Sequence, residues 1–131
     1  FTDPEVARVG LTPAEARARG LAVEVTTFDL AELDRAIADG ENRGFVTVVT
    51  PRGRDRILGA TVVGPHAGDI LAELALAMRH GLGLRKVLGT VHSYPTHAEA
   101  SRAVAGEWQR SHLPLRLLRI AERLSRWQRG G

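Results

Sequence analysis

The chain has 131 residues, of which 44% are apolar, and this length allows one domain with an ordinary hydrophobic core. It contains no cysteine, which excludes a disulfide framework, a thiolate metal site and a cysteine nucleophile within these residues. The formal net charge of +3 is divided unevenly: residues 110–131 carry +5 and the rest carries −2, so we expect no nucleic-acid partner.

The first predicted element is a short helix with a capping sequence. Residues 12–15, TPAE, supply a hydroxyl at the N-cap, a proline at the first helical position and a glutamate at the third. Gly20 follows as a stop. These signals predict a helix over 13–19.

Three strands are predicted in the next forty residues. Alternating apolar and polar residues predict a strand over 22–28, and a helical turn over 31–38 follows it. The runs 45–49 and 57–63 are rich in β-branched residues, and PRGRD between them supplies turn chemistry. We therefore expect these two runs to pair as an antiparallel hairpin.

The second half of the chain reads as helical. Apolar residues at helical spacing predict the main core helix over 69–80, closed by Gly81, and one more turn over 84–88. A loop over 90–95 ends at Pro95, and another helix is predicted to begin at Thr96. Proline restricts the residue before it, so Tyr94 should stand on an extended or turn backbone.

The order of elements favours an α+β fold, with a mostly antiparallel sheet flanked by helices. It lacks the strand and helix alternation of a doubly wound nucleotide domain. No GxGxxG or GxxxxGK[ST] sequence is present, so this chain alone should bind neither a dinucleotide nor a triphosphate. We place one domain at 1–110 and a separate tail at 111–131.

The tail predicts a basic amphipathic helix after Pro114. Its apolar residues repeat at steps of four and three, with arginines around them; they are Leu113, Leu117, Ile120, Leu124 and Trp127. Such a helix can lie on an anionic membrane surface, but it more often packs on its own domain or on a dimer mate. We expect packing and regard membrane contact by the tail as the less favoured alternative.

Three stretches of the chain together resemble one protein family. They are FTDPEVARVGLTPAEARARG at 1–20, RILGATVVGPHAGDILAELALAM at 56–78 and HSYPTHAEA at 92–100. In this order and spacing they resemble the dimerisation domain of pyridine nucleotide-disulfide oxidoreductases, which include dihydrolipoamide dehydrogenases, glutathione reductases and mercuric reductases. The resemblance runs to about Trp108. It implies a two-fold homodimer, with FAD, NAD(P)H and a redox-active cysteine pair bound by domains outside this chain.

The resemblance also assigns site residues. Many members carry His-x-His-Pro-Thr-x-x-Glu here, where the second His and the Glu form an acid-base pair that reaches the partner subunit's flavin and disulfide. The matching positions are His92, Tyr94, Pro95, Thr96 and Glu99. This implies catalytic roles for Tyr94 and Glu99 and cofactor-binding roles for His92 and Pro95.

Tyrosine in place of histidine changes the expected chemistry. An unperturbed imidazole titrates near pH 6 to 7, whereas a phenol has a pKa of about 10. Tyr94 is therefore a good hydrogen-bond donor and a poor base at neutral pH. This makes ordinary dithiol substrates doubtful, and the substitution resembles mercuric reductases and their relatives.

Simpler roles compete with these assignments. Glu99 follows Thr96 by three residues, so it can cap the helix by accepting the Thr96 backbone N–H. Tyr94 can be a plain interface aromatic. His92 and His97 with Glu99 are a weak metal pattern, and we expect no metal site.

These observations predict part of a larger enzyme. The chain opens at Phe1 without an initiator Met or a secretory leader, and no apolar stretch is long enough to span a bilayer, so we expect a fragment of a cytoplasmic oxidoreductase, inactive alone. The alternative is a stand-alone binding or scaffolding domain whose basic tail engages a membrane or a polyanion.

Overall fold

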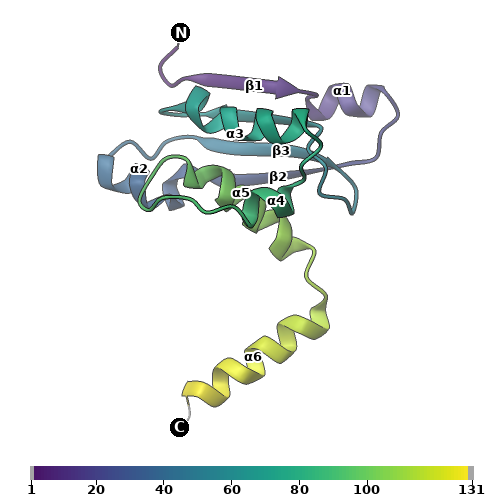
Figure 1. Cartoon of the computed structure of the whole chain (residues 1–131), viewed down its shortest axis with the longest axis vertical. Coiled ribbons are helices and arrows are strands. Elements are labelled where there is room, and N and C mark those ends of the chain that lie inside the picture. The colour runs from purple at the N-terminus through teal and green to yellow at the C-terminus, as the bar shows by residue number, and fades with distance from the viewer. Residues whose placement is uncertain (1, 130–131) are drawn as a thin grey trace.

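Four antiparallel strands form a sheet in the order β1-β4-β3-β2, and helices lie against it (Figure 1). The computed structural model describes residues 2–129 of the chain. Its α+β architecture is the one predicted from the sequence. The strands are β1 Val6–Gly10, β2 Val23–Asp29, β3 Phe45–Pro51 and β4 Gly59–Val63.

The predicted hairpin is confirmed, because β3 pairs with β4 and Thr47 lies opposite Thr61. β2 pairs with the other side of β3. The sequence did not predict β1, which pairs with β4 at the edge of the sheet. Its sequence VARVG has only two β-branched residues and ends in glycine, so pairing with β4 decides its conformation and local propensity does not.

The helices follow the predicted pattern with small shifts of their ends. The capping box of α1 is complete: Thr12 Oγ1 accepts the Glu15 N–H, and Glu15 Oε2 accepts the Thr12 N–H, both at 3.1 Å. The elements are α1 Pro13–Ala18, the 3-10 turn η1 Leu30–Glu32, α2 Asp34–Asp39, α3 Ala67–Arg79, α4 Leu84–Leu88, α5 Glu99–Ser111 and α6 Leu115–Arg129.

The core lies between the sheet and the two long helices α3 and α5. α3 packs on β1 and β4, α5 packs on β2 and β3, and the two helices touch each other. Ser101 Oγ of α5 donates to the backbone oxygen of Ile70 in α3 at 3.1 Å, so this buried hydroxyl is satisfied. The largest fully buried apolar side chains are Trp108, Leu30, Ile70, Leu74, Leu84, Val46, Val48, Val62 and Val104.

α6 extends away from the sheet and its covering helices (Figure 1). The tail was expected to pack its apolar residues on its own domain or on a dimer mate, and the first of these does not occur. Leu117, Ile120 and Leu124 are all more than half exposed. The physical reason is that α5 already closes the core with Trp108, and the chain then turns outward through the segment 112–114 before α6 begins.

Candidate functional site

The loop 90–98 joins α4 to α5 and contains the predicted site residues. Its first residue is tied to α4, because Thr90 Oγ1 donates to the Lys86 backbone oxygen at 2.7 Å. Side chains of α3 and α2 then hold the loop from two sides. The Tyr94–Pro95 peptide bond within it is cis.

His92 fastens the loop to α3. Its Nε2 lies 2.8 and 2.9 Å from the two carboxylate oxygens of Glu73, and its Nδ1 lies 2.8 Å from the Thr90 backbone oxygen. Both nitrogens face acceptors, so a ring that carries a proton on each nitrogen satisfies both contacts. The side chain is only 6% exposed. His92 therefore positions the loop, and its ring nitrogens are already occupied.

Tyr94 projects to the surface and is held by α2. Its hydroxyl donates to Asp34 Oδ2 at 2.7 Å, and the residue is still 70% exposed. This hydrogen bond and then the charge of Asp34 raise the pKa of Tyr94, with smaller contributions from burial and from the charge of Glu99. The phenol therefore stays protonated well into the alkaline range.

Glu99 and Thr96 form half of a capping box. Glu99 Oε2 accepts the Thr96 backbone N–H at 3.1 Å, which confirms the capping contact. Thr96 Oγ1, however, donates to the Ser93 backbone oxygen at 2.7 Å. The prediction that α5 begins at Thr96 is thus wrong, because the hydroxyl stabilises the turn of the loop and the helix starts only at Glu99.

A second contact joins the loop to α2. His97 Nε2 lies 3.0 Å from Asp39 Oδ2, and Arg35 Nε reaches the same oxygen at 2.9 Å. These partners, Arg35 first and His97 next, lower the pKa of Asp39. The His97 ring also stacks on His66, with 4.3 Å between the ring centroids. α2 therefore holds the loop through the residues at the two ends of the helix: Asp34 contacts Tyr94, and Asp39 contacts His97.

Sequence reasoning did not find the residues that hold the loop. Asp34 and Asp39 lie sixty and fifty-eight residues before their partners, and Glu73 lies nineteen before His92. No motif marks them. The only sequence signal is their place on helices next to the loop, which becomes informative once the fold is known.

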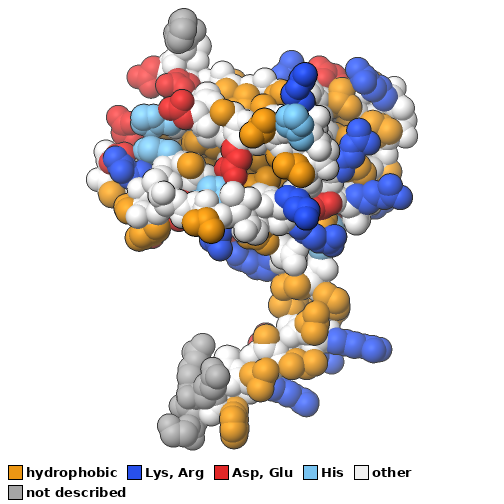
Figure 2. Space-filling model, viewed as in Figure 1, with side chains coloured by type: hydrophobic (Ala, Val, Ile, Leu, Met, Phe, Trp, Pro, Cys, Tyr) orange, Lys and Arg blue, Asp and Glu red, His pale blue; other side chains and the backbone are white. Residues whose placement is uncertain are grey.

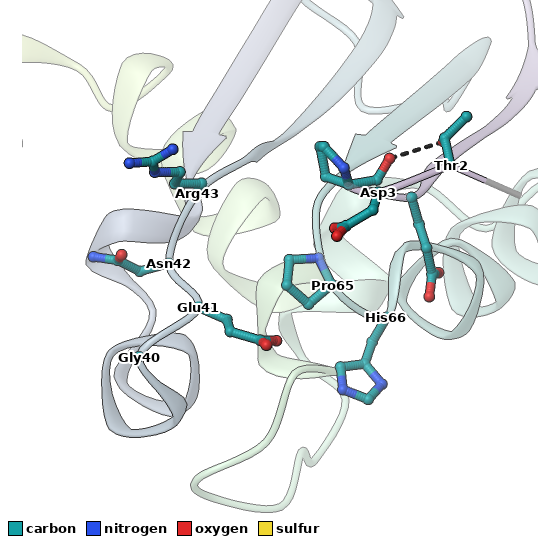
Figure 3. A pocket seen from close by; sticks show the side chains of 10 residues that line it. Thr2, Asp3, Gly40, Glu41, Asn42, Arg43, Pro65 and His66 are labelled. Atoms are coloured by element: carbon teal, nitrogen blue, oxygen red, sulfur yellow. Dashed lines mark hydrogen bonds between the residues drawn. The ribbon is translucent and has the colours of Figure 1, made fainter.

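A cleft of about 720 Å³ lies beside this loop (Figure 3). It is bounded by the chain start at 2–5, by the segment 40–43 after α2 and by Pro65 and His66. Its charged lining consists of the carboxylates of Asp3, Glu5 and Glu41 and the guanidinium of Arg43. Tyr94 and Pro95 are not among its lining residues, so it is separate from the predicted site.

Within residues 2–129, no three His, Cys, Asp or Glu side chains are grouped so that they could hold a metal ion. None of the helices in that part of the chain has the length and apolarity of a bilayer-spanning segment.

A family model described as the pyridine nucleotide-disulphide oxidoreductase dimerisation domain matches residues 1–105. This chain belongs to that family. Full-length members depend on FAD and NAD(P), and the matched part is the domain through which they dimerise.

Several relatives share this domain. The chain is 43% identical over 99 residues to the dihydrolipoyl dehydrogenase of Chlamydia muridarum, covering 76% of this chain and 21% of that protein. It is also 43% identical over 105 residues to the dihydrolipoyl dehydrogenase of Halobacterium salinarum, covering 80% of this chain and 22% of the relative. The chain thus spans about a fifth of the length of these relatives.

Solved structures show the same fold. LpdA from Mycobacterium tuberculosis superimposes with a TM-score of 0.73 at 26% identity, over 80% of this chain and 23% of that one. A Cu(II) complex of the HOCl-induced flavoprotein disulfide reductase RclA from Escherichia coli gives a TM-score of 0.75 at 24% identity, over 81% of this chain and 24% of that one.

Proposed function

We propose that residues 1–110 are the dimerisation domain of an FAD-dependent disulfide oxidoreductase and that they supply Tyr94 to the active site of the partner subunit. The observation that supports this proposal is the exposure of Tyr94: the residue that the sequence resemblance matches to the family's second His is 70% exposed on a loop held from both sides. A loop fixed in this way presents one exposed donor in a defined direction.

Tyr94 acts in this proposal as a proton donor. Its pKa is raised by Asp34, so the hydroxyl is protonated at neutral pH and cannot serve as a base. A phenol can donate to a thiolate or to a substrate atom beside it. Asp34 takes the orienting role that the family assigns to Glu, because its carboxylate is the one bonded to the hydroxyl.

The other assigned residues have distinct roles in the proposal. Glu99 fixes the backbone at Thr96, and its charge also acts on Tyr94. The cofactor-binding roles that the resemblance implies for His92 and Pro95 become, in this proposal, contributions to the shape of the loop that faces the flavin of the partner subunit. Because the ring nitrogens of His92 are bonded to Glu73 and Thr90, His92 contributes by holding the loop.

FAD and NAD(P)H bind, in this proposal, to domains outside this chain. The cleft in Figure 3 does not fit a dinucleotide, because a pyrophosphate would meet the carboxylates of Asp3, Glu5 and Glu41. A pyrophosphate site needs backbone N–H groups or cations directed at it. We therefore expect the isolated chain to be colourless and without activity.

The substrate proposal rests on Tyr94 alone. Exchange of a dithiol with the enzyme's disulfide needs a base near neutral pH, which Tyr94 does not provide. We propose a mercuric reductase-like enzyme, in which the phenol faces a metal-thiolate or another non-dithiol substrate near the cysteine pair. The relatives named above are dihydrolipoyl dehydrogenases, and the tyrosine is the reason for proposing a different substrate.

Dimerisation through the loop surface is the first test. Val91 is 95% exposed beside His92, and burial of such a side chain in a partner is worth about 1.5–3 kcal/mol. We expect the chain to be a homodimer in light scattering across a concentration series. Val91→Glu should weaken the dimer by about tenfold or more.

Val25→Glu is the matched control. Val25 is a partly exposed valine of β2, remote in sequence from the loop, and the change places the same carboxylate on the surface. The dimer should tolerate it. If Val25→Glu dissociates the dimer and Val91→Glu does not, the loop lies outside the interface and Tyr94 cannot reach a partner. A chain that stays monomeric at high micromolar concentration also contradicts the proposal.

A further inference from the structure

α6 carries an apolar face that the rest of the domain leaves uncovered. We call Leu117, Ile120, Leu124 and Trp127 the α6 stripe; steps of three and four residues place them on one side of the helix. Trp127 is 81% exposed and the other three are more than half exposed. Figure 2 shows hydrophobic side chains gathered along α6, away from the body of the domain.

The charges of α6 are arranged around the stripe. The helix contains five arginines and one acidic residue, Glu122. At 100° per residue, Arg116 and Arg123 border one edge of the stripe, while Arg119 and Arg126 lie across the helix from it. Long side chains at such an edge can bury their carbon stems and keep the guanidinium in water. A positive rim thus runs beside an apolar face.

A second copy of α6 is a poor occupant for this stripe. Two copies in contact would bring ten arginines together with two glutamates, and like charges across a helix pair repel. The stripe also covers only about three turns of helix, from Leu117 to Trp127. The charge of α6 therefore favours an anionic surface over another cationic helix.

The length of α6 limits how the helix can bind a lipid bilayer. Its 15 residues are about 22 Å long, and four of the arginines fall within the first twelve residues, so it does not span a bilayer. A helix with one apolar face, a cationic rim and an aromatic residue near its end is suited to lying in the interface of a membrane. Anionic headgroups attract each cation near the surface.

We propose that α6 is an interfacial helix that attaches the chain to an anionic lipid surface. The α6 stripe enters the boundary between headgroups and acyl chains, and Arg116 and Arg123 contact lipid phosphates. α6 lies outside the residues matched by the family, 1–105, and this attachment is independent of the role proposed for Tyr94.

The test is flotation of the complete 131-residue chain with lipid vesicles. It should bind vesicles that contain phosphatidylglycerol and phosphatidylcholine, should not bind phosphatidylcholine alone, and should lose binding as salt is raised. Leu124→Asp removes a stripe residue, whereas Leu118→Asp makes the same change on the other side of the helix. Both add one negative charge, so only the position differs.

We expect Leu124→Asp to bind about tenfold or more weakly than Leu118→Asp, because only Leu124 inserts. Circular dichroism should show the same helix content in both. Equal binding by the two variants would overturn the proposal, as would equal binding to phosphatidylcholine alone. The proposal is also overturned if Leu124→Asp dissociates a dimer in the absence of vesicles, because the stripe would then pack against a second copy of the chain.

A last outcome concerns nucleic acid. If the chain binds duplex DNA in preference to vesicles, and Leu124→Asp does not weaken that binding, then α6 binds a polyanion through its charge and the proposal is wrong.

Discussion

The Tyr94 hydroxyl donates a 2.7 Å hydrogen bond to Asp34, which lies sixty residues earlier in the chain. The bond joins the loop before α5 to the first turn of α2. Tyr94 is the only tyrosine of the chain. Its ionisation can therefore be followed directly, without interference from other phenols.

Asp34→Asn should lower the pKa of Tyr94 toward its ordinary value of about 10, because the hydrogen bond and then the charge of Asp34 are the two largest causes that raise it. Asparagine keeps the shape and an acceptor oxygen but removes the charge. The measurement is the absorbance of tyrosinate as the folded chain is titrated with base.

The control is Asp39→Asn, which removes an equal charge from the far end of α2. It should leave the Tyr94 titration close to that of the parent. If both variants shift the titration equally, the cause is the general field of α2 and not the contact with Asp34.

The sign of the Tyr94 effect on stability follows from the raised pKa. A phenol that loses its proton less readily when folded contributes stability below its unfolded pKa of about 10, and the contribution is lost as pH rises through the folded pKa. Tyr94→Phe should thus remove one part of the alkaline decline of the melting temperature. A parent and variant that decline identically would contradict this linkage.

Asp39 should make the opposite contribution at acid pH. Its pKa is lowered in the fold, by Arg35 first and by His97 next, so its stabilising effect is complete above about 3.9 and is lost as pH falls through the lowered value. Asp39→Asn should flatten this part of the acid decline in urea unfolding. Arg35→Gln should flatten it as well, because it removes the largest cause. An unchanged acid decline in both variants would refute the assignment.

Gly59 tests how closely β1 lies against β4. A Cβ built at Gly59 would come within 2.0 Å of the Leu11 backbone oxygen, so an alanine must displace the chain at the end of β1. Gly20 has a φ of +75° but no atom within 4 Å of its Cβ position, and alanine there should cost only about 1–2 kcal/mol. Gly59→Ala should lower the free energy of unfolding, measured in urea, by clearly more than Gly20→Ala does. If the two substitutions lowered the free energy of unfolding equally, the end of β1 could move away from β4 without loss of stability.

Local patterns predicted most of the fold. The hairpin of β3 and β4 follows from two β-branched runs around a turn, and the helix α1 follows from its capping box; both are contacts between near neighbours in sequence. The edge strand β1 was not predicted, because its partner β4 lies some fifty residues away and its own sequence is weakly β-forming.

The site was predicted less completely. The loop and Tyr94 came from the family resemblance, but the residues that hold them did not. Asp34 and Glu73 are ordinary surface carboxylates until the fold brings α2 and α3 beside the loop. The direction of α6 was also not predictable. An amphipathic pattern indicates that one face of a helix is apolar, but it does not indicate what packs against that face.

The last prediction concerns the complete flavoenzyme in which we propose Tyr94 to act. Tyr94→Phe keeps the ring and removes only the hydroxyl, so the dimer and the flavin content should be unchanged. A hydrogen bond to a charged group is worth about 1.5–3 kcal/mol, and about 1.4 kcal/mol corresponds to one decade in rate. Turnover should therefore fall about tenfold or more.

Asp34→Asn should retain turnover at neutral pH. It should move the alkaline limb of the profile of kcat against pH to lower pH, because the Tyr94 hydroxyl then ionises more readily. Tyr94→His should not restore dithiol reductase activity by itself, since the carboxylate at the hydroxyl is that of Asp34 and Glu99 is bonded to the Thr96 backbone. Turnover of Tyr94→Phe equal to that of the parent on every substrate tested would make Tyr94 an interface aromatic and nothing more.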